Sequence, residues 1–363
     1  MSNLATDHEG RLGVEAWRGL AAWLVVWTHL APAGGMDWPL LRFAFTGVDL
    51  FFVLSGFVFA PYLWGKPLPV AAFGVRRFFR IYPAYLLALG VYVALKLQAG
   101  HAPLYLWEHL TFTQVQSREM AFYYNPPFWS LPAEVEFYLL LPLLVRALAA
   151  WRAGWALLGV AALLMRLLLG WSGDSASQSL SWLLSYHLPG LLLEFLLGAL
   201  AWRICERGLR RSARLALGLA GLAGWAVLAA LFAQLGDAGL DATPLKGQIS
   251  WLAALCFACM VTATLSLKSP LSGRGPQPPA PVWQKLARQL ALWAGRLSYG
   301  TYLFHLAAMQ LLLASGLKVP TPFPLGLTGA ASVLTLAMAW VCYRFWEEPW
   351  RRWGRAQAAR LTR

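Results

Sequence analysis

The chain has 363 residues, of which 59% are hydrophobic and 13% are charged. Since soluble domains carry about 25% charged residues, this chain has too few charges to cover a water-soluble surface, and we expect an all-α polytopic membrane protein. Its 30 Lys and Arg against 16 Asp and Glu give a net charge of +14. A nucleic-acid binder gathers such bases on a hydrophilic surface, so the composition argues against nucleic acid as a partner.

The residues before Trp17 are polar and contain neither a basic region nor a small-residue cleavage site, so we expect no removable signal peptide. Beyond them, apolar runs recur at the length of about 20 residues that one membrane helix needs. Ten such runs give the predicted membrane spans, which lie near residues 17–33, 43–65, 79–98, 129–148, 153–171, 181–202, 213–235, 248–267, 291–314 and 324–346.

The loops between these spans differ in charge. Twenty Lys and Arg lie in or beside the second, fourth, sixth and eighth loops and the C-terminal tail, against five in the opposite loops. Since cytoplasmic loops collect Lys and Arg, we predict that both termini are cytoplasmic.

Two segments stand out from the predicted spans. Residues 269–281 are rich in Pro and Gly and are predicted to be a cytoplasmic linker. Residues 99–128 form the longest outer segment, which either lies along the outer surface or re-enters the membrane. We expect residues 1–363 to form a single transmembrane domain with no appended soluble domain.

Six ionisable residues recur inside the predicted spans, and they are Arg18, His29, Asp49, Glu134, Glu194 and His305. A charged side chain at the centre of a membrane helix costs roughly 2.5 to 3.5 kcal/mol. We therefore expect these groups to face an internal site that is hydrated or mutually paired. Arg166 and Arg296, near span ends, are better explained as snorkelling or structurally paired groups.

Depth in the membrane suggests which of these groups meet. The predicted orientation places His29 and Asp49 at similar depths in the first and second spans, so that they are able to pair. Glu134 and His305 are also predicted in the outer half. Glu136, two residues after Glu134, points to the opposite side of its helix, so that at most one of the two faces the site.

Two further polar groupings lie on helix faces. Ser298, Tyr302 and His305 share one face of the ninth span, because their spacing is i, i+4 and i+7. Arg77 and Arg80 share a face at the cytoplasmic start of the third span. They are explained either as topology signals and lipid headgroup contacts or as a phosphate clamp, since the guanidinium fork matches phosphate oxygens.

Seven segments of the chain form an ordered series: RGLAAWLVVWTHL (18–30), GVDLFFVLSGF (47–57), RRFFRIYPAYLL (76–87), FWSLPAEVEFYLLLPLL (128–144), EFLLGALAW (194–202), LSYGTYLFH (297–305) and RFWEEPWRR (344–352). Together they resemble the motifs of the acyltransferase-3 family of integral membrane O-acyltransferases. The resemblance implies transfer of an acetyl or other short acyl group from cytoplasmic acyl-CoA to a hydroxyl of an extracytoplasmic glycan, lipid or small molecule. It also implies a multi-pass protein of a bacterial cytoplasmic (inner) membrane.

By this resemblance, Arg18 and His29 are the Arg and His of the first span, and Arg77 and Arg80 are the family's Arg-x-x-Arg pair. Asp49 stands in the second-span motif.

The fourth-span motif is matched only in part. Glu134 occupies the first acidic position that follows Trp-Ser-Leu, but the sequence reads Pro-Ala-Glu-Val-Glu where two adjacent acids are common. The second acid, Glu136, is therefore left without an assigned role.

These residues lead to a hypothesis for catalysis. Three arginines, Arg18, Arg77 and Arg80, hold the CoA phosphates. His29, oriented by Asp49, removes the proton of the acceptor hydroxyl. Glu134, Tyr302 and His305, together with Ser298 and Glu194, bind the acceptor or stabilise the oxyanion. A covalent acyl-imidazole intermediate is an open variant.

No permanently bound cofactor is expected, because acyl-CoA, and acetyl-CoA above all, acts as the donor substrate. The other expected partners are a carbohydrate or lipid acceptor and the lipid bilayer. No metal site is expected either, since Cys256 and Cys259 lie in an apolar span without His partners. The sequence leaves the acceptor, the length of the acyl group and the oligomeric state open.

The main alternative is a polytopic transporter or flippase of a glycan or lipid precursor, in which buried charges line a substrate path. This alternative gives no reason for the pair Arg77 and Arg80 at one cytoplasmic entry. A polyprenyl-phosphate sugar transferase would carry acidic metal-binding loops, and the sequence contains no such loop.

Overall fold

The computed structural model describes residues 8–33, 35–36, 38–151, 153–171, 180–241, 245, 247–265, 281–316 and 324–362. These residues form helices and no strand, which confirms the all-α class. The longer helices are α1 (His8–Ala33), α3 (Gly47–Leu63), α4 (Val70–Gln98), α7 (Ser130–Ala150), α8 (Gly154–Trp171), α10 (Leu188–Arg207), α11 (Arg211–Asp241), α12 (Ile249–Thr264), α13 (Val282–Ala314), α14 (Pro324–Cys342) and α15 (Glu348–Arg360). The short elements are α2 (Pro39–Phe43), η1 (Ala44–Thr46), α5 (Leu106–Leu110), η2 (Gln114–Gln116), α6 (Arg118–Phe122), η3 (Pro126–Trp129), α9 (Leu180–Tyr186) and η4 (Tyr343–Glu347).

Every predicted span coincides with a helix or a pair of helices, although several boundaries differ. Helices α1, α4 and α13 each begin nine residues before the predicted span, because polar residues continue a helix beyond its apolar part. The sixth predicted span is interrupted at His187 and consists of α9 and α10. Pro189 lies in the first turn of α10, where its missing N–H costs no hydrogen bond. Of the predicted linker, residues 269–280 lie outside the described residues.

Within the described residues, six helical segments are long and apolar enough to cross a membrane. They are Pro39–Leu63, Val70–Gln98, Leu180–Arg207, Arg211–Gly236, Val282–Ala314 and Gly326–Arg360. Two further apolar helices, Gly154–Gly170 and Ile249–Thr264, are shorter. The count of ten spans and the cytoplasmic position of both termini remain predictions.

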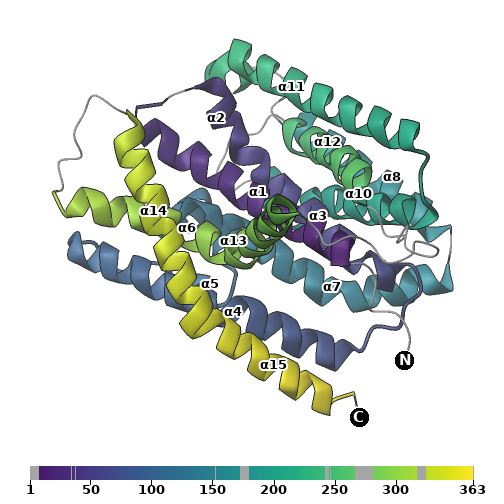
Figure 1. The fold of residues 1–363 in the computed structure, drawn as a ribbon, viewed down its shortest axis with the longest axis horizontal. Coiled ribbons are helices and arrows are strands. Elements are labelled where there is room, and N and C mark those ends of the chain that lie inside the picture. Colours follow the sequence, from purple (N-terminus) through teal and green to yellow (C-terminus); the bar gives the residue numbers. More distant parts are fainter. Residues whose placement is uncertain are drawn as a thin grey trace.

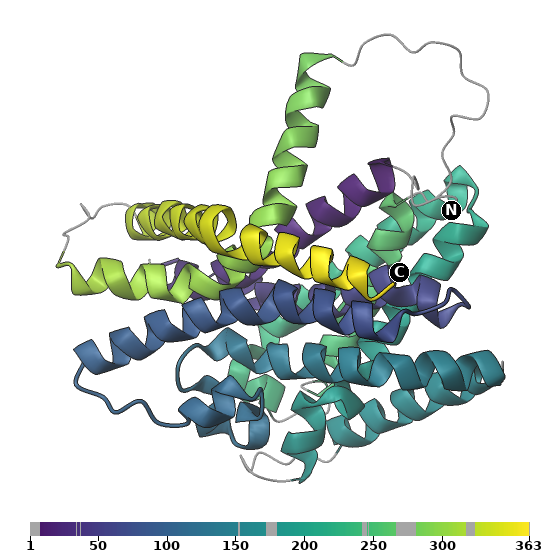
Figure 2. The same cartoon turned by 90° about the horizontal axis from the view of Figure 1, so that it is seen from below.

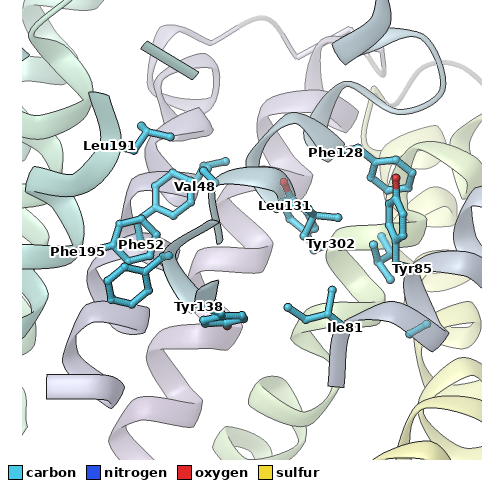
Figure 3. Packing of buried hydrophobic residues seen from close by; sticks show 14 of the residues in the cluster. Val48, Phe52, Ile81, Tyr85, Phe128, Leu131, Tyr138, Leu191, Phe195 and Tyr302 are labelled. Atoms are coloured by element: carbon cyan, nitrogen blue, oxygen red, sulfur yellow. The ribbon is translucent and has the colours of Figure 1, made fainter. Parts of the chain in front are cut away.

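The helices pack around α13, which lies beside α1 and α14 near the middle of the molecule (Figure 1). Helix α3 pairs with α10, α11 with α12, and α4 with α15. Between α3, α7 and α10 the core is aromatic: the ring centroids of Phe52 and Phe195 are 5.0 Å apart, and those of Phe137 and Phe195 are 4.2 Å apart. Figure 3 shows Phe52 and Phe195 side by side in this cluster.

Helices α3 and α10 approach closely through two glycines. A Cβ atom at Gly56 would lie 1.9 Å from the carbonyl oxygen of Phe195, and one at Gly198 would lie 1.9 Å from that of Val53. Small residues at a crossing allow backbones to come together, which is how membrane helices gain packing energy without a hydrophobic driving force. The two glycines therefore fix the position of α3, which carries several residues of the site.

Residues 99–128 fold into the short helices α5, η2, α6 and η3, which pack on the bundle. The hydroxyl of Tyr85 on α4 donates to the carbonyl oxygen of His109 at 2.9 Å. The side-chain amide of Asn125 donates to the carbonyl oxygen of Leu303 on α13 at 3.4 Å. Tyr105 and Phe112 adopt left-handed backbone conformations, with φ of 56° and 58°. The segment is thus an ordered cap on α4 and α13.

Candidate functional site

A polar cavity of about 70 Å³ lies between α1, α3, α4, α7 and α13. A buried water needs at least roughly 10–15 Å³ of such space, so the cavity has room for several waters or part of a ligand. It brings together six of the ten predicted site residues, which are Arg18, Arg77, Arg80, Glu134, Ser298 and Tyr302. Figure 3 shows Tyr302 together with three further residues of the cavity wall, Ile81, Leu131 and Tyr138.

Three guanidinium groups make this cavity cationic. Arg77 lies over the ring of Phe59, with its central carbon 5.1 Å from the ring centroid, and its Nε has no hydrogen-bond partner in the described structure. Arg18 pairs with Glu15 at 3.2 Å. Arg80 interacts electrostatically with Glu347, which is itself bridged to Arg351. A wall of this charge suits an anion, because guanidinium groups bind phosphate and carboxylate oxygens through directed hydrogen bonds.

Glu134 is held inside the same cavity. It accepts a hydrogen bond from the hydroxyl of Ser55 at 3.2 Å and another from the hydroxyl of Tyr138, one helical turn away. Glu134 thus shares a cavity with the three arginines and Tyr302 rather than with Asp49, while its position in the outer half of the membrane stays a prediction. Glu136 faces away, as its spacing predicts, and binds His187 and the backbone N–H of Leu188.

His29 and His305 form a second group. Their ring centroids are 5.2 Å apart. The Nδ1 atom of His29 lies 2.7 Å from the carbonyl oxygen of Val25, and that of His305 lies 2.9 Å from that of Tyr302. A carbonyl oxygen only accepts, so Nδ1 carries the hydrogen in each neutral ring and Nε2 presents a lone pair. Both imidazoles are thus oriented as proton acceptors through Nε2.

Tyr302 connects the histidines to the cavity. Its ring centroid is 6.4 Å from that of His305, and the Tyr302 ring is also part of the cavity wall. Its hydroxyl lies 2.6 Å from that of Ser130 and also donates to the carbonyl oxygen of Pro127. A ligand that fills the cavity therefore ends close to the two imidazoles.

Asp49 and Glu194 lie in a third group, away from His29. Asp49 is 3% exposed and Glu194 is fully buried. Their carboxyl groups interact with each other and with Arg166, whose Nη2 is 3.9 Å from Glu194 Oε1. The predicted pairing of Asp49 with His29 is therefore wrong, because the rotation of α3 turns Asp49 toward α8 and α10. Arg166 is structurally paired here rather than snorkelling.

Sequence reasoning missed four hydroxyl-bearing residues of the cavity wall, which are Ser55, Ser130, Tyr138 and Tyr299. The i, i+4 spacing of Glu134 and Tyr138 was a usable signal for one of them. Sequence reasoning also left Arg166 out of the site. An arginine beside two buried acids, here Asp49 and Glu194, is their expected counter-ion.

A family model described as an acyltransferase domain (Acyl_transf_3) matches residues 11–344. The chain belongs to this acyltransferase family. Among curated proteins, it is similar to "Acyltransferase MdmB" of Streptomyces mycarofaciens, with 32% identity over 184 residues that cover 45% of this chain and 47% of that protein. It is also similar to "Nodulation protein 10" of Rhizobium leguminosarum bv. viciae, with 29% identity over 160 residues that cover 38% of this chain and 43% of that protein. The matched parts thus cover less than half of either relative's length. No solved structure matches the chain.

The family match confirms the resemblance in the sequence motifs. Together with the apolar helices, it shows that this member of the acyltransferase family is an integral, multi-pass membrane protein. It does not favour the transporter or flippase alternative, since the matched model spans nearly the whole helical bundle.

Proposed function

We propose that the chain is an acyl-CoA-dependent O-acyltransferase of a bacterial cytoplasmic membrane. It moves an acetyl or other short acyl group from cytoplasmic acyl-CoA to a hydroxyl of an extracytoplasmic glycan, lipid or small molecule. The observation that carries this proposal is the cavity in which Arg18, Arg77 and Arg80 surround a space that ends near His29 and His305. Arginines beside a pair of histidines fit a donor that carries both phosphates and a thioester.

In this proposal the arginines bind the donor. Arg77 and Arg80, with Arg18 beside them, hold the phosphates of CoA, while the pantetheine arm extends along the cavity toward Tyr302. Glu134 stays hydrogen-bonded to Ser55 and Tyr138 and orients the neighbouring guanidinium groups. Ser298 and Tyr302 line the part of the cavity nearest the histidines and contact the thioester.

The imidazoles carry the proton chemistry. Nε2 of His29 takes the proton of the acceptor hydroxyl while the hydroxyl oxygen attacks the thioester carbonyl. The carbon–sulfur bond then breaks, and the protonated ring returns the proton to the sulfur, so that the products are an ester and CoA. The hydroxyl of Tyr302 turns from the carbonyl oxygen of Pro127 to the oxyanion and stabilises it. Neutral His305 accepts a hydrogen bond from the acceptor through Nε2. Asp49 and Glu194 act indirectly, by holding α3 and α10 in place through Arg166.

The test measures release of free CoA from acetyl-CoA by membrane vesicles of the producing cell, which supply the acceptor. We expect His29→Ala to lower the rate by about 10²-fold or more, the range of general-base catalysis. Arg80→Ala should raise the KM for acetyl-CoA about tenfold and change kcat less, because a charge-assisted contact to the donor is lost. Arg118→Ala, in the outer segment, is the matched control and should leave both constants unchanged.

Two results would contradict the proposal. Full turnover by His29→Ala would exclude His29 as the base. A wild-type chain that releases no CoA under these conditions, yet changes the distribution of a glycan or lipid across the membrane, would instead be a transporter.

A further inference from the structure

The first third of α13 stands outside the helical bundle. Residues 282–290 are all exposed, and the large apolar side chains among them are among the most exposed in the protein: Val282 is 80% exposed, Trp283 67%, Leu286 59% and Leu290 61%. Figure 2 shows this part of α13 leaving the bundle, with no other described helix beside it. Its apolar side chains therefore need a cover that the described residues do not supply.

The length of α13 explains why this part is outside. At 1.5 Å per residue its 33 residues extend about 50 Å, whereas the hydrocarbon core of a bilayer is about 30 Å thick. About 13 residues are thus in excess. The buried residues of α13 start at Gly295, so the excess is the segment 282–294, which precedes the part that lines the cavity.

This segment is amphipathic and basic. Val282, Leu286, Leu290 and Trp293 follow one another at i, i+4, i+8 and i+11, which places them on one face, with Trp283 at its edge. Lys285 and Arg288 lie outside this stripe, and neither forms an ion pair with a described residue. An apolar stripe with tryptophans, bordered by unpaired bases, is the pattern of a helix that lies in a membrane interface.

We propose that residues 282–293 form an interfacial helix whose apolar stripe rests in the lipid surface and whose bases, Lys285 and Arg288, bind anionic phospholipid headgroups. The segment continues directly into a membrane-spanning helix, so the bilayer is the surface next to it. The segment lies at the start of the ninth predicted span, and the Lys and Arg distribution predicts that this end is cytoplasmic. Anionic lipids of the cytoplasmic leaflet attract Lys and Arg side chains. A second copy of the chain fits less well, because stripe-to-stripe packing would bring the basic borders of both copies together.

The interfacial helix fixes the start of α13 relative to the membrane. Directly after it, Gly295 packs against Glu15, since a Cβ atom at Gly295 would meet the side chain of Glu15 at 2.2 Å. Glu15 in turn pairs with Arg18 of the cavity. The interfacial helix is thus connected to the cavity wall through Gly295, Glu15 and Arg18. The proposal rests on the membrane location of the protein and not on the identity of the acyl donor.

The test uses the full chain with a nitroxide label on Leu286→Cys, in the stripe, or on Gln284→Cys, on the opposite face. Both are reconstituted in vesicles of phosphatidylcholine with phosphatidylglycerol, and the labelled wild type gives the background of the native cysteines. We expect the label at 286 to be relaxed by oxygen, which concentrates in lipid, and the label at 284 by a water-soluble nickel chelate. Equal relaxation by the chelate at both positions would overturn the proposal, and so would spin–spin broadening at 286, which indicates a second copy.

The lipid headgroup is tested in the same vesicles. The double substitution Lys285→Gln and Arg288→Gln should reduce the ratio of lipid-embedded to water-exposed label at 286 by roughly fivefold for each base. This reduction should disappear in vesicles of phosphatidylcholine alone. Arg118→Gln is the matched control and should have no effect in either lipid. An unchanged ratio in the double variant would exclude anionic headgroups as the ligand.

Discussion

At the scale of single residues, rotation about a helix axis decided the partners. The depth in the membrane predicted from the sequence placed His29, Asp49 and Glu134 together. Depth alone does not predict contacts, because each residue turns a helix by about 100° and so points to a different side than its neighbour. The structure groups His29 with His305, Asp49 with Glu194, and Glu134 with the arginines. The candidate site is therefore a series of adjacent groups rather than one cluster.

One buried residue of the outer segment makes stability depend on pH. Burial lowers the pKa of His109 to about 4, from 6.5 in an unfolded chain. Because the folded value is the lower one, the stabilisation is fully present above pH 6.5 and is lost as the pH falls from 6.5 toward 4. At about pH 5 the loss is about 2 kcal/mol. Thermal unfolding of purified protein at about pH 7.5 and pH 5 measures it.

The matching variants separate this residue from other titrating groups. His109→Gln retains a donor near the carbonyl oxygen of Met120, which lies 3.0 Å from Nε2, but cannot be protonated, so it should lose less stability on acidification than the wild type. His101→Gln, at an exposed position of the same segment, should behave as the wild type does. Identical pH dependence of the wild type and His109→Gln would refute this assignment.

At the scale of elements, the apolar pattern predicted where helices exist, and local chemistry decided where they end. Polar turns extend α1, α4 and α13 beyond the apolar runs, and the turn before Pro189 divides the sixth span. These details position the site, since Arg77 lies in the polar extension of α4. The crossing of α3 and α10 adds a constraint that the sequence pattern does not reveal.

Gly198→Ala should destabilise the protein by about 1–3 kcal/mol, because the added methyl group has no space beside the carbonyl oxygen of Val53 and forces the helices apart. Gly90→Ala is the control: it lies in α4, and a Cβ atom there meets nothing within 4 Å. This substitution should be neutral or slightly stabilising, since Ala favours a helix over Gly. Unfolding midpoints in detergent compare the two. Equal midpoints would mean that the crossing tolerates a larger residue.

At the scale of the whole molecule, the charge of the loops predicts a topology that the fold is compatible with. The end of α15 lies at the same end of the molecule as the start of α4 (Figure 1), with the rings of Phe79 and Trp353 4.6 Å apart. This contact places the C-terminal helix next to the basic start of α4, so we expect the two on one side of the membrane.

We therefore expect a fluorescent protein fused after Arg363 to fold and fluoresce in bacterial cells, because it does so only in the cytoplasm. Alkaline phosphatase fused after Arg118 should be active, because it requires the outer side. The same two reporters exchanged between the positions are the controls and should both be silent. The opposite pattern would reverse the topology, and the direction of the proposed acyl transfer with it.

The sequence by itself determined the all-α membrane class, the location of the helices and the acyltransferase family, because these depend on apolar length and on motifs that lie within single segments. It also predicts the arginines, His29, Tyr302 and His305 as site residues, and their roles stay predictions. Only the tertiary structure decided which groups meet. Contact between distant helices depends on their rotation, tilt and crossing, which are set by the packing of side chains such as Phe52 on Phe195 and by glycines such as Gly198.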